Sequence, residues 1–393
     1  MKSEWKEYKL EDICIKITDG SHYSPKPQAE GFPMFSVKDM GEYNFCYTNC
    51  KYISLYDYKK MQQNDCVPQK GDILVAKDGS YLKQIFVCKE TKEEAILSSI
   101  AIFRPNTKIV LPTFLSYLLK SPDVYNHIKL NCVSGSALPR IVLKDFKKIE
   151  LTIPDFERQR KIAAVLSALD DKIELNNKTN ENLEQQLVCL YNAIFKNNTQ
   201  YCELGSVVDT TSGGTPSRKK DEYYKNGSIC WVKSKELTGT YLIDTEEKIT
   251  EVGLSSSSAK IIPSNSTLIA MYGATVGEYG IISKPMTCNQ AVCALIPNEN
   301  FPFTVVFMFA MSNKNNLINL AIGSAQQNIS QILIRQMKIC CDLSLNKRFH
   351  DIAEPIFEKI KEIVVENQRL SALRDTLLPK LMNGEIDVSE VKI

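Results

Sequence analysis

Two short loops, at residues 18–22 and 211–215, place small hydroxyl side chains beside glycines. They read Thr-Asp-Gly-Ser-His and Thr-Ser-Gly-Gly-Thr and occupy equivalent positions in the two halves of the chain. Small hydroxyl groups and backbone amides near glycine suit contacts with phosphate oxygens. Plain turns have a similar composition. The two loops are therefore candidates either for a phosphate-binding surface or for structural turns.

Two further pairs of loops recur with different side chains. Residues 77–81 read Lys-Asp-Gly-Ser-Tyr, where residues 271–275 read Met-Tyr-Gly-Ala-Thr. Residues 134–140 read Ser-Gly-Ser-Ala-Leu-Pro-Arg, where residues 323–328 read Gly-Ser-Ala-Gln-Gln-Asn. In a DNA major groove, arginine pairs well with guanine, and glutamine or asparagine pairs well with adenine. Matching loops with unlike side chains predict one task performed on two different targets.

The residues that catalysis needs do not form a recognisable motif. The chain has no Pro-Pro dipeptide for an amino-methyltransferase motif, and its glycines at 273, 277 and 280 fit neither a dinucleotide fingerprint nor a P-loop. Glu-x-Lys triplets begin at Glu7 and Glu246, as in metal-dependent nucleases, but such triplets arise easily by chance in a chain rich in Lys and Glu. Of the three histidines, only His22 lies in a loop where a hydrolytic triad could use it. The sequence predicts a binding protein with no cofactor and no metal of its own.

The composition is that of a folded protein. The 393 residues are 44% hydrophobic and 24% charged, which is enough for two or three packed cores. The 13 cysteines include no C-x-x-C spacing, which argues against zinc fingers, and the net charge of +2 does not by itself indicate a nucleic-acid ligand. Because no apolar run is long enough to cross a bilayer, we expect a cytoplasmic protein without membrane contact.

The chain contains a long internal repeat. Gly135-Ser136-Ala137 recurs as Gly323-Ser324-Ala325, an offset of 188 residues, and Ile162-Ala163 recurs as Ile352-Ala353, an offset of 190. The offset is 194 for the Leu-Val-Ala and Leu-Ile-Ala runs at 74–76 and 268–270, and also where Leu10 and Gly20-Ser21 face Leu204 and Gly214-Thr215. Such drift indicates loop insertions in an old duplication. The repeating unit is a domain plus one long element.

That element is a long helix in each half. Apolar residues alternate at steps of four and three from Ile162 to Ile194, and no Gly or Pro interrupts residues 155–198. A second run extends from Ile356 to Leu381. This periodicity is typical of coiled-coil seams, and the first helix would be about 65 Å long. We expect the two helices to pack on each other, with Asn176, Asn180 and Asn367 setting the register of the seam.

The rest of each half reads as a mixed α+β domain. Short apolar runs at 72–76, 85–88 and 100–103, with further strands at Val37 and Ile53, are separated by turn residues. Similar runs follow at 229–232, 268–271, 280–282 and 291–295, and helices are predicted at 112–120 and 302–312. The predicted fold is α+β, with two pseudo-repeated mixed domains separated by two long antiparallel coiled-coil helices. The expected segments are domain 1 (1–153), the central helix (154–198), domain 2 (199–340) and the C-terminal helix (341–393).

Taken together, these features resemble the specificity subunit of a type I restriction-modification enzyme over the whole chain. The residues that carry the resemblance are Trp5-Lys6 with Lys9-Leu10, Ser212-Gly213-Gly214-Thr215-Pro216, Ala270-Met271-Tyr272-Gly273-Ala274-Thr275 with Gly277, Gly323-Ser324-Ala325-Gln326-Gln327-Asn328-Ile329, Ile153-Pro154 before Glu157-Arg158-Gln159, and Leu373-Arg374-Asp375-Thr376-Leu377-Leu378-Pro379-Lys380-Leu381 before Gly384-Glu385-Ile386. The first half departs from the commoner loop forms at 77–79 and 137–140.

The resemblance implies a non-catalytic subunit. In such subunits two target-recognition domains each read one half of a bipartite DNA site, and two antiparallel helices hold them apart as a ruler. Two modification subunits would bring S-adenosylmethionine and adenine-N6 methylation, and restriction subunits would add ATP-driven translocation and cleavage. The implied partners of this chain are thus double-stranded DNA, two modification subunits and restriction subunits.

The loops supply the candidate DNA-contacting residues. They are Thr18, Gly20, Ser21, His22, Lys38, Lys77, Ser80, Tyr81, Ser134, Ser136 and Arg140 in the first half, and Ser212, Thr215, Lys233, Lys235, Tyr272, Thr275, Gln326, Gln327 and Asn328 in the second. The alternative from another class is a coiled-coil adaptor that binds only proteins. A self-contained methyltransferase or nuclease is disfavoured by the missing motifs.

Overall fold

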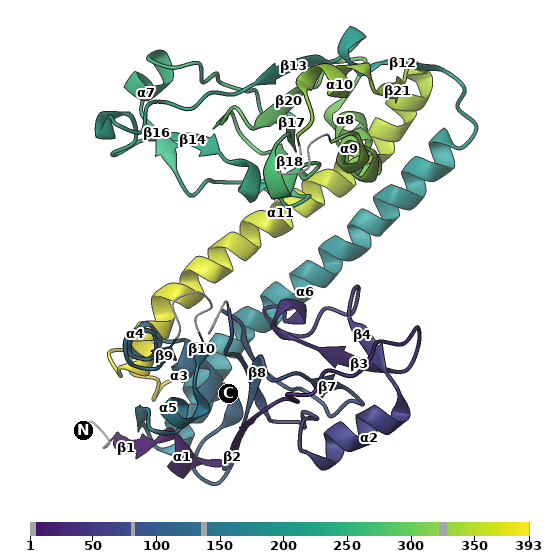
Figure 1. The fold of residues 1–393 in the computed structure, drawn as a ribbon. Helices are drawn as coiled ribbons and strands as arrows, with labels where there is room; N and C mark the ends of the chain where they lie inside the picture. The colour runs from purple at the N-terminus through teal and green to yellow at the C-terminus, as the bar shows by residue number, and fades with distance from the viewer. Residues whose placement is uncertain (1–4, 80–82, 135–139, 322–327, 393) are drawn as a thin grey trace. The chain divides into compact units, whose positions relative to one another are not determined.

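The chain forms two compact units in the computed structural model, which describes residues 5–79, 83–134, 140–321 and 328–392 (Figure 1). Unit 1 comprises Met1–Glu174 and Leu370–Ile393, and unit 2 comprises Leu175–Arg369. Each unit contains a mixed α+β domain together with one half of each long helix, α6 (Phe156–Phe195) and α11 (Leu343–Met382). The predicted fold class is confirmed.

Unit 1 is built on a four-stranded sheet in the order β2-β8-β5-β6 and a three-stranded sheet in the order β4-β3-β7. Two further antiparallel pairs are β1-β11 and β9-β10. The strands are β1 (Lys6–Lys9), β2 (Cys14–Asp19), β3 (Phe32–Phe35), β4 (Lys51–Ile53), β5 (Ile73–Ala76), β6 (Ile85–Val87), β7 (Ala95–Ile96), β8 (Ile100–Pro105), β9 (Val133–Ser134), β10 (Arg140–Ile141) and β11 (Glu150–Ile153). The short helices are α1 (Leu10–Ile13), the 3-10 helix η1 (Val37–Asp39), α2 (Leu55–Gln63), α3 (Pro112–Lys120), α4 (Pro122–Asn131) and α5 (Leu143–Lys147).

The core of unit 1 explains why its central strands are apolar throughout. All four residues of β5 are fully buried, because the sheet is covered on both faces. On one face, Phe114 and Leu115 of α3 join the same cluster as Ile73 and Val75. Pro112 opens α3, a position where its missing N–H costs nothing.

Unit 2 has a five-stranded sheet in the order β13-β20-β17-β18-β15, a three-stranded group in the order β16-β14-β19, and the pair β12-β21. The strands are β12 (Tyr201–Glu203), β13 (Asp209–Ser212), β14 (Ile229–Val232), β15 (Tyr241–Leu242), β16 (Lys248–Ile249), β17 (Thr267–Ala270), β18 (Tyr279–Ile282), β19 (Thr287–Cys288), β20 (Val292–Ile296) and β21 (Lys338–Cys340). The α-helices are α7 (Glu251–Ser255), α8 (Phe303–Ser312), α9 (Lys314–Leu320) and α10 (Gln331–Gln336). Four 3-10 helices complete the unit: η2 (Leu204–Ser206), η3 (Asp221–Tyr223), η4 (Ser234–Glu236) and η5 (Gly273–Thr275).

The two units repeat one topology. The order β2-β8-β5-β6 matches β13-β20-β17-β18, and β4-β3-β7 matches β16-β14-β19 in both strand order and direction. A β-bulge between Cys14 and Lys16 adds one residue to β2. Beyond this bulge, the offset between equivalent residues of the two units falls from 194 to 193. The Ser21 amide donates to the Ile96 carbonyl as the Gly214 amide donates to the Cys288 carbonyl, so Gly20 is equivalent to Gly213. The pairing of Gly20-Ser21 with Gly214-Thr215 was therefore wrong by one residue.

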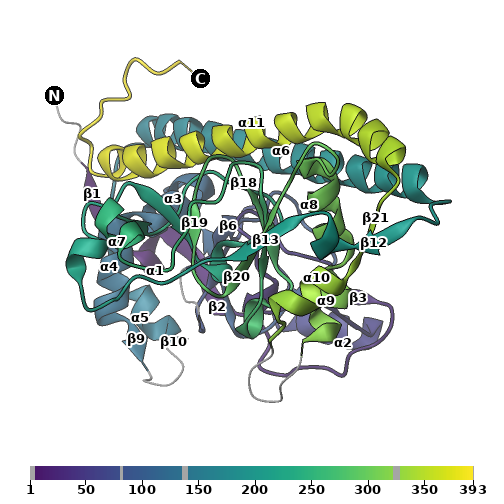
Figure 2. The ribbon, with the colours of Figure 1, turned by 90° about the horizontal axis from the view of Figure 1, so that it is seen from above.

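Within each unit, the two helix segments lie side by side and run antiparallel (Figure 1, Figure 2). In unit 2, Asn176 of α6 donates to Asn367 of α11 over 2.8 Å, while further along the seam Phe195 meets Phe349. In unit 1, Ile162 shares a cluster with Met382. In both units, residues further along α6 thus lie beside residues nearer the start of α11, as expected for antiparallel helices.

A polar layer interrupts the apolar seam in unit 2. The Asn176 amide also donates to Glu366, and the Asn367 amide donates to Asn177, each over 2.8 Å. The side-chain oxygen of Asn180 is buried and has no hydrogen-bond partner in the described part of the chain. Asn176 and Asn367 therefore form the layer, with Asn177 in place of Asn180.

Two local predictions differ from the structure. Val37 begins a 3-10 helix instead of lying in a strand, because Ser36 and Asp39 close a capping turn around it. Helix α11 begins at Leu343, close to the expected start at 341, where Asp342 accepts from the Leu345 amide, but it ends at Met382 and does not extend to 393. No helix among the described residues combines the length and apolar character needed to cross a membrane.

Candidate nucleic-acid interface

The recurring loops of unit 1 converge at one end of its four-stranded sheet. Strands β2 and β5 both finish there, and β8 starts there, because Asp19 lies opposite Ala101 and Ala76 lies opposite Ile100. We call this surface rim 1 and define it as residues 18–22, 77–79, 97–99, 133–134 and 140–141. Rim 2 is its counterpart in unit 2: residues 211–215, 271–275, 289–291 and 328–330.

Rim 1 is held together by contacts between segments far apart in sequence. The Lys77 ammonium lies 2.8 Å from the Asp19 carboxylate, and both side chains are largely buried, with exposed fractions of 7% and 13%. The Lys77 amide donates to Ser99, and the Lys77 carbonyl accepts from Ile141 over 2.9 Å. Arg140 lies 3.1 Å from Asp78 and projects into solvent with 62% of its side chain exposed. Three of the predicted loops therefore form one surface.

Rim 2 uses the same backbone connections with different side chains. The Met271 carbonyl accepts from the Ile329 amide over 2.9 Å, and Tyr272 bridges to Asn328 as Asp78 bridges to Arg140. The Thr215 hydroxyl donates to Gln290. Where rim 1 carries two ion pairs, the described contacts of rim 2 join neutral groups. The loops that match in sequence thus also match in their backbone connections, while their side chains differ.

Close backbone approach explains a glycine at the start of each rim. A Cβ on Gly20 would lie 2.3 Å from the carbonyl oxygen of Ile96, and one on Gly213 would lie 1.9 Å from that of Cys288. Real side chains do not come this close, so only glycine lets these loops pass the neighbouring strands. The positions predicted as phosphate contacts are therefore also structurally required.

The predicted residues of unit 1 differ in how accessible they are. His22, Lys38, Ser134 and Arg140 are exposed, and Thr18 and Ser21 are half-buried. Gly20 and Lys77 are buried, so the ammonium of Lys77 is not presented to solvent. Ser80, Tyr81 and Ser136 lie outside the described residues.

The predicted residues of unit 2 form two groups. Ser212, Thr215, Tyr272, Thr275 and Asn328 belong to rim 2. Lys233 and Lys235 lie beside it at the 3-10 helix η4 and pair with Glu246 and Glu247. Hydrogen bonds from Lys235 and Lys233 lower the pKa of Glu246, so that carboxylate partly neutralises both lysines. Gln326 and Gln327 lie outside the described residues.

Sequence reasoning missed several residues at the two rims. Asp19, Ser98, Ser99 and Gln290 were not singled out, although the last three directly precede strands that the sequence predicts. Arg218 was also missed. Its guanidinium stacks 4.4 Å from the ring centroid of Tyr224 and 4.8 Å from that of Trp231, whose indole N–H donates to Gly214 of rim 2. A basic residue close to a glycine loop and followed by aromatics was the available signal.

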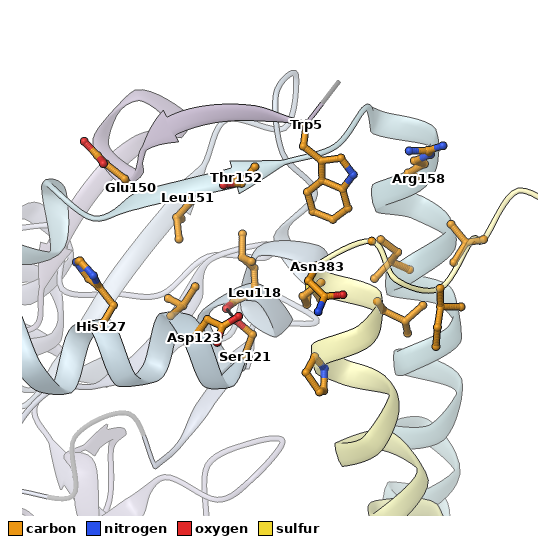
Figure 3. Close-up of a pocket in the computed structure, with 18 of the residues that line it drawn as sticks. Trp5, Leu118, Ser121, Asp123, His127, Glu150, Leu151, Thr152, Arg158 and Asn383 are labelled. Atoms are coloured by element: carbon orange, nitrogen blue, oxygen red, sulfur yellow. Dashed lines mark hydrogen bonds between the residues drawn. The ribbon is translucent and has the colours of Figure 1, made fainter. Parts of the chain in front are cut away.

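A cavity of about 750 Å³ lies elsewhere in unit 1 (Figure 3). Trp5, just before β1, lines it together with His127 of α4, Thr152 of β11, Arg158 of α6 and Asn383 after α11. None of its lining residues belongs to rim 1. Among the described residues there is no group of three His, Cys, Asp or Glu side chains able to hold a metal ion.

Comparison with known proteins identifies the family. A family model for the type I restriction modification DNA specificity domain matches residues 2–185 and 196–340. The chain belongs to this family. The type I specificity relatives include the HindI specificity subunit of Haemophilus influenzae, which is 26% identical over 470 residues, covering 98% of this chain and 100% of that protein. The MjaIX specificity subunit of Methanocaldococcus jannaschii is 25% identical, covering 99% of this chain and 95% of that protein.

A solved structure agrees on the fold. The type I restriction-modification S subunit of M. genitalium superposes with a TM-score of 0.58 at 16% identity, covering 97% of this chain and 96% of that one. The resemblance inferred from sequence is confirmed. The relatives are named as specificity subunits, so this chain is the non-catalytic subunit of a type I restriction-modification enzyme, as predicted.

Proposed function

We propose that this chain reads a bipartite target in double-stranded DNA, with rim 1 contacting one half-site and rim 2 the other. The observation that carries the proposal is the pair of rims itself: one backbone network is used twice, with Arg140 in one unit where Asn328 stands in the other. Arginine favours guanine and asparagine favours adenine. Two such rims would read two different half-sites, and together these form a bipartite, non-palindromic target.

The chain acts with catalytic partners in this proposal. Two modification subunits dock on the exposed faces of α6 and α11 and supply S-adenosylmethionine and adenine-N6 methylation, and restriction subunits add cleavage. The family and the names of the relatives support these partners. The domain assignment follows from the same proposal: residues 1–153 and 199–340 recognise DNA, and residues 154–198 and 341–393 set the spacing.

The direct test is a matched pair of substitutions, Arg140→Ala and Asn328→Ala, assembled with the modification subunit and followed by sequencing of N6-methyladenine. Each should relax its own half-site and leave the other unchanged, because each removes about 1–3 kcal/mol of base discrimination at one position. Lys129→Ala, exposed on α4, is the control. Equal loss at both half-sites in either variant would refute the assignment.

The spacing role has a separate test. Removing one heptad from α6 between Asn176 and Leu183, and its partner heptad around Asn367 of α11, shortens both helices by about 10 Å. That length corresponds to about three base pairs of B-DNA, so the unread spacer should shorten by that amount. A variant that methylates the original spacing would contradict the ruler.

Salt dependence separates this function from that of a protein-only adaptor. DNA affinity should fall steeply with ionic strength, since phosphate neutralisation releases counterions. A complex whose DNA affinity is absent or independent of salt would favour the adaptor.

A further inference from the structure

A buried charged cluster in unit 1 joins the recognition domain to both helix segments. Asp170 of α6 is only 7% exposed and lies 2.8 Å from Arg374 of α11. The Tyr117 hydroxyl donates to Asp170 over 2.6 Å, and the Tyr43 hydroxyl does so over 3.1 Å. Arg374 also donates to Glu42 over 2.9 Å and to Tyr43 over 3.2 Å. One arginine and one carboxylate thus connect residues 42–43, α3, α6 and α11.

The hydroxyl groups in this cluster remain donors. Burial, followed by the charge of Asp170, raises the pKa of Tyr117 far above its ordinary value, and burial and Asp170 do the same for Tyr43. Both phenols therefore stay protonated and keep donating to the carboxylate.

The equivalent place in unit 2 is apolar. Asp155 and Asp342 cap the two helices in the same way, which aligns α6 with α11 at an offset of 187 residues. The pairing of Ile162 with Ile352 at an offset of 190 was therefore wrong by three residues: Ile162 is buried and Ile352 is exposed. The alignment from the caps places Phe357 at the position of Asp170 and Leu187 at that of Arg374. Both are about 1% exposed in the main cluster of unit 2, where Phe307 packs edge-on against Phe357. The fold therefore does not need charges at this place.

Burying a charged pair where apolar residues suffice is costly, so the pair calls for a role other than stability. The cluster is joined to rim 1 through a short path. Met40 and Phe45 bridge to close a turn around Glu42 and Tyr43, and this turn directly follows the 3-10 helix that carries Lys38. The Val37 amide at the start of that helix donates to the Ser99 hydroxyl of rim 1 over 3.1 Å.

We propose that Asp170 and Arg374 are positioning residues that hold rim 1 in one orientation on the helix segments 156–174 and 370–382. This inference rests on the proposed DNA reading, and it gives a task to Arg374 of the Leu-Arg-Asp-Thr-Leu-Leu-Pro motif. A rim held in one orientation accepts its half-site at one distance from the second half-site. Loss of the cluster widens the spacing that the chain accepts.

Two variants test this role without depending on a single fold-sensitive change. The double substitution Asp170→Phe with Arg374→Leu copies the residues of unit 2 and removes both charges together. Tyr43→Phe deletes the hydroxyl that hydrogen-bonds with Asp170 and Arg374, and it leaves the ion pair and the contact between Arg374 and Glu42 intact. Tyr47→Phe is the matched control, because its hydroxyl donates over 2.8 Å to Glu94, away from the helices.

The assay uses the full chain with its modification subunit, on duplexes whose spacer is natural, one base pair longer or one base pair shorter. The readout is the ratio of methylation rates on altered and natural spacers. We expect this ratio to rise about tenfold in the double variant and about threefold in Tyr43→Phe, which correspond to losses of about 1.4 and about 0.7 kcal/mol of discrimination. Tyr47→Phe should leave it unchanged.

The outcomes separate this inference from the proposed function. A wild-type complex that methylates no bipartite motif would reject the DNA-reading function itself. The positioning role alone is overturned if the wild type methylates its motif normally but Tyr43→Phe and Tyr47→Phe give the same ratio of methylation rates. A double variant that loses activity equally on all spacers would also overturn it.

Discussion

We expect unit 1 to lose stability when either partner of the buried ion pair between Asp19 and Lys77 in rim 1 is removed alone. Lys77→Met would leave the Asp19 carboxylate buried, with only His22 nearby at 3.4 Å. His22 is 77% exposed and can offset little of this burial. Removing one partner of a buried pair typically costs about 3–5 kcal/mol, and the remaining exposure of Asp19 places this case near about 3 kcal/mol.

The matched variant replaces both residues with those of rim 2. Asp19→Ser with Lys77→Met copies Ser212 and Met271, which occupy the same positions in unit 2. Because no charge is left buried, its stability should lie within about 1 kcal/mol of the wild type. Asp19→Ser alone also leaves a buried charge without its partner, so the double-mutant cycle should give a coupling energy of at least about 2 kcal/mol between the two positions.

Hydrogen exchange measured by mass spectrometry is the assay, with unit 2 as an internal reference. Peptides covering β2, β5 and β8 should lose protection about 100-fold in Lys77→Met, as about 3 kcal/mol implies. Peptides covering β13 and β17 should not change. If Lys77→Met leaves the protection of unit 1 intact, or if the two single effects simply add, the pair is not the buried connection described here.

Three further predictions concern other parts of the molecule. Gly213→Ala should destabilise unit 2 by about 3 kcal/mol, because its Cβ meets the Cys288 carbonyl. Gly79→Ala has open space around the Cβ and should cost only about 1 kcal/mol for its positive φ, and urea denaturation compares the free energies of unfolding of the two variants. Asn367→Leu should change stability by less than about 1 kcal/mol but permit self-association through the seam, seen as concentration-dependent sedimentation; a strictly monomeric variant would contradict a register role. Burial raises the pKa of Cys288 and Cys293 to about 12, so at pH 8 only about one of these thiols in 10⁴ is ionised. Iodoacetamide should therefore label the exposed thiols of Cys46 and Cys189 first. Early labelling of Cys288 would show that the core of unit 2 opens.

The elements that the sequence predicted best are those with a dominant local pattern. The runs at 72–76 and 268–271 become β5 and β17 because strands buried on both faces are apolar throughout. The narrow apolar stripe predicted the long helix α6 nearly to its ends. The C-terminal helix was expected from residue 341, but its apolar seam only from Ile356, because the earlier buried residues Phe349 and Ala353 pack into the core of unit 2 and not into that seam.

The candidate surface was only partly predictable, for a different reason. The loops were found because they recur, but their partners come from distant segments: Lys77 meets Asp19, and Thr215 meets Gln290. No local pattern encodes such contacts. Lys77 reads as an available cation in sequence, yet tertiary packing buries it beside a carboxylate.

Under the proposed function, one scaffold serves two targets. The connections that fix each rim are backbone hydrogen bonds, such as Ile141 to Lys77 and Ile329 to Met271, and backbone bonds do not depend on side-chain identity. The side chains at these positions can therefore vary from an ion pair to neutral groups while the loops keep their course. Only the glycines at close backbone approaches are fixed. Changes of specificity at Asp19, Arg140 or their counterparts should then cost little folding stability when both members of a pair change together.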